Sequence, residues 1–273
     1  MSTVLITGCS SGFGELAAIH FADHGHRVFA TMRTPGKSEA LNARSDIEQL
    51  PLDVSSSASV DAAIAEAIDR AGRLDIVVNN AGIEVFGPVH LLSDDEVSQQ
   101  LDTNVGGVVR VVRAVVPHFF EHGGGTIVNV GSVAGLVGPP YSGIYAASKH
   151  AVEALTEAMH FELSHRGIRV HVIEPGQFAT ELGNNSVHAG AMLEGSDEHA
   201  RWQRFRMASA TLVNGEPAPA QIVAEAIYSA ATEQPGKLRH PVGADTELIV
   251  ATKSSMSFED FDTTMRAVLN WHD

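Results

Sequence analysis

The sequence predicts an α/β fold in which a doubly wound parallel sheet carries helices on both faces. Short apolar runs alternate with segments of helical spacing along most of the 273 residues, and this alternation favours a parallel sheet. The apolar runs are nearly continuous, as expected for strands that are buried on both faces. Neither an internal repeat nor a low-complexity linker is apparent, so we expect one domain over residues 1–273.

In the first half of the chain, capping signals support each predicted helix. The helix at 14–25 ends at Gly25, and the helix at 56–72 begins among serines and ends at Gly72. Serine suits a helix start and glycine a helix end. Apolar, β-rich runs predict strands at 3–7 and 27–32, a strand within 47–54, and a strand followed by a turn over 74–82.

The second half continues the alternation with one break. Residues 94–123 have the spacing of a long helix or a helix pair, and residues 144–163 and 219–232 that of two further helices. We interpret residues 177–218, which are rich in Asn, Gly, Ser, Glu and His, as an excursion over the sheet and not as a second domain. Strands are predicted at 125–132, 168–176 and 237–243.

The charge balance argues against one class of partner. The chain has 18 Lys and Arg residues against 33 Asp and Glu residues, a net charge of −15, whereas nucleic-acid affinity depends largely on basic side chains. The single cysteine, Cys9, cannot form an intrachain disulfide, which fits a reducing compartment. No signal-peptide pattern is apparent, and no apolar run reaches the ~18 residues of a membrane span. We expect a cytoplasmic protein without nucleic-acid or membrane partners.

A glycine-rich turn joins the first strand to the first helix. Gly8, Gly12 and Gly14 let the backbone approach a phosphate, and the helix N-terminus offers free N–H groups. Thr7 and Ser10 could support the turn by side-chain hydrogen bonds. The pattern predicts a dinucleotide phosphate site, and the alternative is a tight turn without a ligand.

The end of the second strand bears on the choice of cofactor. An Asp or Glu there would bind the ribose 2′-hydroxyl of NAD, but the strand runs into Arg33. A guanidinium suits a 2′-phosphate by charge and geometry, and Lys37 follows in the next loop. We therefore favour NADP(H) over NAD(H). The alternative is that Arg33 is solvated or stacks on adenine, which leaves the preference open.

Further motifs follow the other strands, and all of them occur within residues 3–180. They are TGCSSGFG (7–14), Asp53 after the third strand, NNAG (79–82), Asn104, Ser132, Tyr145-x-x-x-Lys149 and PGQFAT (175–180). In kind and order this set resembles the short-chain dehydrogenase/reductase family in its single-domain form. The glycine turn and YAASK are most like the hydroxysteroid and retinol dehydrogenase branches. The resemblance implies a Rossmann fold that transfers a hydride between NADP(H), or NAD(H), and a carbonyl or secondary alcohol.

The resemblance also implies the residues of the site. Cofactor-binding residues would be Gly8, Ser10, Ser11, Gly12, Phe13 and Gly14 at the pyrophosphate, Arg33, Asp53 and Val54 at the adenosine, and Asn80, Ala81, Gly82, Tyr145, Lys149, Pro175, Gly176 and Thr180 towards the nicotinamide. Catalytic residues would be Asn104, Ser132, Tyr145 and Lys149. Tyr145 would exchange a proton with the substrate oxygen, which Ser132 would hold. Asn104 would position a water that passes protons to Lys149.

Tyr145 and Lys149 are one helical turn apart and share a helix face. A free tyrosine titrates near pH 10, too high for an effective base at neutral pH. A cation about 5 Å away at an effective dielectric constant of about 20 contributes roughly 3 kcal/mol, or about two pKa units. We therefore predict that Lys149 lowers the pKa of Tyr145. In isolation, the two residues could instead be a half-buried tyrosine and a solvated lysine.

Two other functions would use the same fold. A non-catalytic dinucleotide-sensing regulator would not need the complete Asn–Ser–Tyr–Lys set. A nucleotide-sugar epimerase or dehydratase usually has a different glycine turn and a larger C-terminal domain. His118 with His122, and His24 with His26, lack an HExxH motif or a Cys/His cluster, so we expect no metal site.

Apolar residues around the expected site favour an apolar alcohol or ketone as the substrate, covered by the excursion at 177–218. The alternative is that several of them only pack the excursion onto the body. They are Phe86, Leu136, Val137, Pro139, Pro140, Met192 and Trp202. By resemblance, helices at 94–119 and 145–164 would pair chains into a homodimer or homotetramer.

Overall fold

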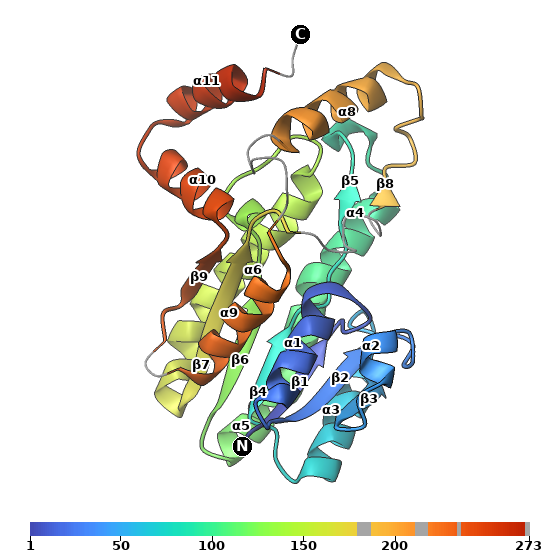
Figure 1. The fold of residues 1–273 in the computed structure, drawn as a ribbon, viewed down its shortest axis with the longest axis vertical. Helices are drawn as coiled ribbons and strands as arrows, with labels where there is room; N and C mark the ends of the chain where they lie inside the picture. Colours follow the sequence, from blue (N-terminus) through green and yellow to red (C-terminus); the bar gives the residue numbers. More distant parts are fainter. Residues whose placement is uncertain (179–186, 211–217, 234–235, 271–273) are drawn as a thin grey trace.

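A seven-stranded parallel sheet, in the order β3-β2-β1-β4-β6-β7-β9, forms the centre of the protein (Figure 1). The computed structural model describes residues 1–178, 187–210, 218–233 and 236–270. The strands are β1 (Thr3–Thr7), β2 (Arg27–Met32), β3 (Ile47–Pro51), β4 (Ile76–Asn79), β6 (Gly125–Val130), β7 (Ile168–Pro175) and β9 (Arg239–Val242). The strand order reverses between β1 and β4, so the crossovers place helices on both faces. The predicted doubly wound α/β fold is confirmed.

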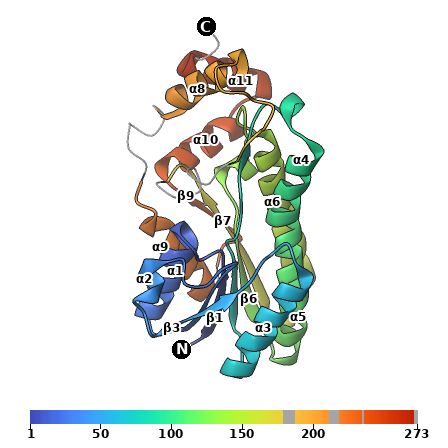
Figure 2. The same cartoon turned by 90° about the vertical axis from the view of Figure 1, so that its right-hand side faces the viewer.

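Each face of the sheet has its own hydrophobic core. One face is covered by α1 (Gly12–Asp23), α2 (Glu39–Asn42) and α9 (Gln221–Thr232), and the other by α3 (Ser57–Ala71), α5 (Gly107–Glu121) and α6 (Gly143–Leu163) (Figure 2). Phe21 and Ile227 are fully buried on the first face, and Leu74 and Phe119 on the second. Burial of each such side chain contributes about 1.5–3 kcal/mol, so both layers hold the sheet in place.

The pattern at 94–123 forms a helix pair without a loop. A π-helical segment, Asp102–Gly106, joins α4 (Asp94–Leu101) to α5. The capping box of Ser93 and Glu96 fixes the start of α4. π-Helical turns frequently occur at functional sites, and this one carries Asn104.

The main differences from the predicted elements lie in the excursion and after residue 243. Within the excursion, β8 (Val187–His188) pairs with β5 (Val85–Phe86), and residues Asp197–Ala210 form α8. Two unpredicted helices, α10 (Ala244–Ser254) and α11 (Phe258–Leu269), follow β9. The sequence did not predict α8, α10 and α11, because these three helices bury few side chains. The buried ones are Trp202 on α8, Asp245 and Thr246 on α10, and Leu269 on α11. The remaining short turns are η1 (Val89–Leu91), η3 (Val133–Gly135) and η4 (Ser164–Arg166).

Several strands end earlier than their apolar pattern suggested, which places the motifs just beyond the sheet. β4 ends at Asn79 and β6 at Val130, so residues 80–82 and 131–132 are loop residues. Asn79 pairs with Asn129 in the register, and Asn79 Nδ2 donates to Asn129 Oδ1 at 2.9 Å. The motifs therefore meet at one edge of the sheet, where open α/β folds bind ligands.

Gly124, directly before β6 at the opposite edge of the sheet, offers a test of how closely backbone segments pack in this fold. Its φ of +128° is in a region that suits glycine, and a Cβ would collide with the carbonyl of Gly167. We expect Gly124→Ala to lower the free energy of unfolding by roughly 2–4 kcal/mol, from backbone strain plus the clash.

Gly123→Ala is the matched control, because Gly123 also has a positive φ but a Cβ there meets nothing within 4 Å. Its cost should be only about 1–2 kcal/mol. Urea denaturation of the two variants measures the difference, and equal losses would contradict the predicted clash.

Candidate active site

The glycine turn is built by direct packing against the turn that follows β4. A Cβ on Gly8 would lie 2.7 Å from Ala81 Cα, and one on Gly14 would lie 2.6 Å from Gly8 O. Gly8 and Gly12 also have positive φ values, +74° and +64°. Glycine is therefore required here both by conformation and by space.

Thr7 and Asn80 connect the two turns by hydrogen bonds. Thr7 Oγ1 accepts from the backbone N–H groups of Asn80 and Ala81, both at 3.0 Å. Asn80 Nδ2 donates to Thr7 O at 2.8 Å and to Gly8 O at 3.0 Å. The support expected from Thr7 thus runs through NNAG.

The start of α1 has the chemistry of an anion site. Ser11 occupies the N-cap position in extended backbone, and its side chain makes no capping hydrogen bond. An uncapped helix N-terminus beside glycines, with Phe13 packed edge-on against Phe178 at 5.8 Å between centroids, fits a phosphate group. Ser10, which the sequence suggested as a second support for the glycine turn, is exposed.

Arg33 and Asp53 lie beyond the ends of neighbouring strands, since Met32 of β2 pairs with Pro51 of β3. Arg33 is exposed, and no salt bridge found within the described ranges includes it. Hydrogen bonds from Ser55 lower the pKa of Asp53, and the nearby positive charge of Arg33 lowers it further. Val54 is buried where α5 begins: a Cβ on Gly107 would lie 2.9 Å from Val54 Cβ.

Asn104 is held in place by the residue that follows NNAG. Its Oδ1 accepts from Ile83 N at 2.9 Å, and its Nδ2 donates to Ile83 O at 3.0 Å and to Ser148 Oγ at 3.1 Å. The side chain is buried. Asn104 therefore joins the π-helical segment, the turn after β4 and helix α6.

Ser132, Tyr145 and Lys149 come together on the buried side of α6. The Tyr145 hydroxyl is in hydrogen-bonding reach of Ser132, whose Oγ also accepts from Ala134 N at 3.1 Å. Lys149 Nζ donates to Val130 O at 2.8 Å and lies 5.6 Å from the centroid of the Tyr145 ring. The structure brings Ser132, Tyr145 and Lys149 together, and Asn104 reaches the same turn of α6 through its hydrogen bond to Ser148.

The prediction that the protein's own groups lower the pKa of Tyr145 is wrong. Burial raises this pKa, the negative charge of Glu84 raises it further, and only the hydrogen bond with Ser132 opposes them. Burial also lowers the pKa of Lys149 to about 8. Desolvation of the phenolate outweighs the attraction of a lysine whose ammonium is bound to the Val130 carbonyl.

The Pro175–Gly176 turn is fixed by a residue that sequence reasoning missed. Gln177 N donates to Asp245 Oδ2 at 2.7 Å, and Gly176 N donates to Val242 O at 3.0 Å. Asp245 is buried at the start of α10. No pattern marks it, because its partner is 68 residues away. The predicted site residue Thr180 lies outside the described residues.

The short chain dehydrogenase family matches residues 2–190 of the chain. The chain is a short-chain dehydrogenase/reductase. "Uncharacterized oxidoreductase YusZ" of Bacillus subtilis is 34% identical over 275 residues, covering 97% of each protein. A "3-ketodihydrosphingosine reductase" of Bacteroides thetaiotaomicron is 40% identical over 182 residues, which are 67% of this chain and 66% of that protein.

A solved structure extends the similarity to the whole dehydrogenase. A short-chain dehydrogenase from Streptomyces avermitilis covers 100% of both chains with a TM-score of 0.83 and 27% identity. The family resemblance inferred from the motifs is thus confirmed. The dehydrogenase is an NAD(P)-dependent oxidoreductase that acts on CH–OH or C=O groups.

Two residues predicted to line the substrate pocket, Met192 and Trp202, pack the excursion onto the body of the dehydrogenase. Met192 and Trp202 are buried in a cluster with Ala189, against which Leu91, Leu92 and Tyr141 pack. These side chains attach the excursion to the body of the dehydrogenase, which is the alternative that the sequence left open. Phe86 lies beside this cluster, 6.4 Å from Trp202 between ring centroids.

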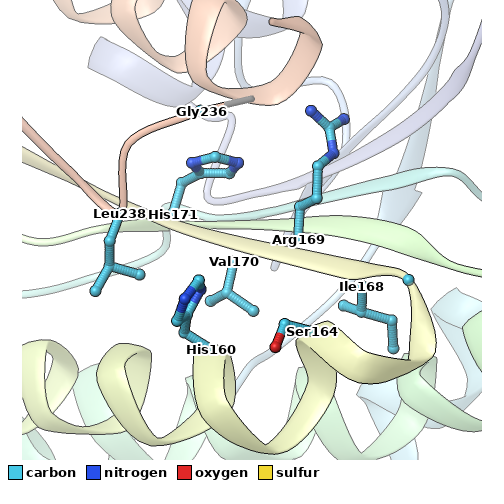
Figure 3. A pocket seen from close by; sticks show the side chains of 9 residues that line it. His160, Ser164, Ile168, Arg169, Val170, His171, Gly236 and Leu238 are labelled. Atoms are coloured by element: carbon cyan, nitrogen blue, oxygen red, sulfur yellow. The ribbon is translucent and has the colours of Figure 1, made fainter. Parts of the chain in front are cut away.

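Other features lie away from the site. A pocket of about 360 Å³ opens at the start of β7. It lies between His160 of α6, Ser164 of η4, His171 and Leu238 (Figure 3). Within the described part of the chain, no three His, Cys, Asp or Glu side chains form a possible metal site. In the same residues, no helix has the length and apolar character to span a membrane.

A pair of buried acids lies behind Lys149 in the dehydrogenase. Glu153 follows Lys149 by one turn of α6, Glu174 precedes Pro175, and their side chains are only 7% and 2% exposed. Arg239 Nε lies 3.2 Å from Glu153 Oε2 and 3.3 Å from Glu174 Oε1. No described residue donates a hydrogen bond to Oε1 of either acid.

One guanidinium cannot neutralise both acids, since Arg239 also binds Glu157 at 2.7 Å. Burial, with the charge of Glu174 adding to it, raises the pKa of Glu153 to about 8, and burial also raises the pKa of Glu174. The two carboxyl groups are in hydrogen-bonding reach of one another. We therefore infer that the pair holds one proton between them at neutral pH.

This shared proton makes stability depend on pH. The folded pKa of Glu153 is raised above its ordinary value of 4.5, so the contribution is complete below pH 4.5 and is lost as the pH rises through about 8. We expect the free energy of unfolding to fall by about 1–2 kcal/mol between about pH 6 and pH 9. Glu174→Gln, whose amide donates a hydrogen bond without titrating, should remove at least half of this fall.

Chemical denaturation across this pH range measures the effect. Glu157→Gln is the control, because Glu157 binds the same arginine but is half exposed, and it should keep the pH dependence of the unsubstituted protein. An unchanged slope in Glu174→Gln would show that the two acids do not share a proton.

Proposed function

We propose that this dehydrogenase transfers a hydride between NADP(H) and the carbonyl or secondary alcohol of an apolar substrate, with Tyr145 as the general acid or base. One observation carries the proposal: the buried hydroxyls of Ser132 and Tyr145 lie in hydrogen-bonding reach, with Lys149 one turn away, at the strand edge that bears the glycine turn. The convergence of proton-transfer groups with a phosphate cradle fits dinucleotide chemistry.

The residues present fit a dinucleotide along the carboxyl edge of the sheet. The glycine turn and the uncapped start of α1 would hold the pyrophosphate. Arg33, Asp53 and Val54 would hold the adenosine end, and residues 80–82 with Pro175 and Gly176 would face the nicotinamide end. When bound, the cofactor supplies or accepts the hydride.

The protein's own groups handle the proton. Burial keeps Tyr145 protonated, since it raises the pKa of this residue, and the protonated phenol is the form that donates to a carbonyl oxygen during reduction. Ser132, in hydrogen-bonding reach of the same hydroxyl, would hold the substrate oxygen. Lys149, with its pKa lowered to about 8, can give up a proton near neutral pH to restore the phenol.

Exposed apolar side chains on α4, α5 and α6 support an oligomer as part of this proposal. Large apolar side chains are exposed on α4 (Leu101, 37%), α5 (Val109, 43%) and α6 (Phe161, 79%). We propose a homodimer or homotetramer that buries this surface, and the mass measured by light scattering tests it.

Tyr145→Phe tests the role of the phenol. We expect kcat to fall by about 10²–10⁴-fold, because the proton-transfer group is lost, while the Kd for NADPH measured by fluorescence changes by less than about threefold. Tyr228→Phe on α9 is the control, and it should retain turnover. A dinucleotide-sensing regulator would instead bind cofactor and turn over nothing in either form.

Arg33→Ala tests the cofactor preference. Loss of a charged hydrogen bond to a 2′-phosphate should raise the KM for NADPH by about 10–100-fold, with little change in the KM for NADH. Lys37→Ala, in the same exposed loop, should have a smaller effect. If both cofactors respond equally to Arg33→Ala, the arginine does not read the phosphate.

A further inference from the structure

Glu84 is a carboxylate inside the candidate active site that no motif marks. It is the second residue after NNAG and is half-buried between apolar neighbours in the run Ile83-Glu84-Val85-Phe86. Its negative charge acts on both Tyr145 and Lys149. A position-by-position reading of the family motifs skips it, because it lies beyond the turn.

The backbone around Glu84 is fixed from every side. Asn104 binds both backbone groups of Ile83. Gln100 Oε1 accepts from Val85 N at 2.7 Å, and the Glu84 carbonyl accepts from Val187 N of β8 at 3.0 Å. The side chain therefore projects from a rigid support between the body and the excursion.

The carboxylate is directed towards the start of α6. Ser142 Oγ donates to Glu84 Oε1 at 3.2 Å, and Ser142 is the buried N-cap residue of that helix, three positions before Tyr145. The acid thus lies beside the phenol proposed to protonate the substrate oxygen.

Glu84 has no direct ion-pair partner among the described residues, although the positive charge of Lys149 acts on it from a distance. All lysines and arginines of the chain lie within the described ranges, and none of the salt bridges among those ranges includes Glu84. The ammonium of Lys149 donates to Val130 O. A half-buried carboxylate without an ion-pair partner is costly, and burial accordingly raises the pKa of Glu84 to about 7.

We propose that Glu84 binds a protonated amine of the substrate next to the reacting carbon, so that the preferred substrates are amino ketones or amino alcohols with an apolar remainder. This inference rests on the proposed function. A substrate ammonium would supply a direct ion-pair partner and favour the ionised carboxylate. The apolar residues nearby, such as Phe86, would contact the rest of such a molecule.

The test compares three ketones that differ only beside the carbonyl: 3-aminooctan-2-one, 3-hydroxyoctan-2-one and octan-2-one. The purified full chain reduces each with NADPH, and kcat/KM is measured for the unsubstituted protein and for Glu84→Gln. We expect the preference for the amino ketone over octan-2-one to fall by about 10–100-fold in the variant, mainly through KM. Glu198→Gln, on the excursion helix α8, removes the same charge elsewhere and should leave this preference unchanged.

Ser142→Ala provides a second variant that keeps the charge. It removes the hydrogen bond to Glu84 Oε1, so the amino-ketone preference should fall by less than in Glu84→Gln. This variant also decides the case in which Glu84→Gln does not fold, because an unchanged preference in Ser142→Ala would then overturn the inference.

The outcomes separate the possible roles of Glu84. An equal loss for all three ketones in Glu84→Gln would mean that it acts through Tyr145 and Lys149, which overturns the inference. If the kcat/KM values for the amino ketone and the hydroxy ketone fall equally in Glu84→Gln, Glu84 accepts a hydrogen bond from any donor and does not select an ammonium. This result would also overturn the inference. If the unsubstituted protein reduces none of the three while a wider carbonyl panel also fails, the proposed function itself fails.

Discussion

The close approach of α6 to the ends of β6 and β7 is the constraint on which the site depends. A Cβ on Gly131 would lie 2.9 Å from Glu153 Oε1, and one on Gly135 would lie 3.0 Å from the carbonyl of Lys149. Any larger residue at these two positions would push the helix outward. The distance between the Ser132 turn and Tyr145 is therefore set by backbone packing and not by the polar groups themselves.

The same close packing removes water from ionisable groups, and desolvation then decides their charges. Burial raises the pKa values of Tyr145, Glu84 and Glu153 and lowers that of Lys149. Each group is shifted towards its neutral form, as expected where the surroundings are poorly polarisable. A site whose ionisable groups are shifted towards their neutral forms responds strongly to any charge that a substrate or cofactor adds. The proposed roles of Tyr145 and Glu84 both depend on this response.

Sequence patterns predicted the elements whose residues are buried at regular spacing, and the motifs that stand at their ends. Strands β1 and β2 have the predicted bounds. Ser132, Tyr145 and Lys149 lie together, and Asn104 binds Ser148 on the same helix. Helices α8, α10 and α11 escaped prediction because each buries only one or two side chains. Asp245 escaped because its importance comes from its contact with Gln177, far away in the sequence. Glu84 begins a segment, 84–92, that the sequence places near the substrate pocket, but its contact with Ser142 could not be predicted.

The sequence by itself determined the α/β fold, the family and the set of side chains available for chemistry. The periodicity of apolar residues and the spacing of the motifs are local properties of the chain that need no coordinates. Only the tertiary structure decided the electrostatics. A spacing of four residues shows that Lys149 is near Tyr145, but not that both are buried, that the ammonium is bound to Val130 O, or that Glu84 faces them. Those facts depend on which distant segments exclude water, and they reverse the direction of the tyrosine pKa.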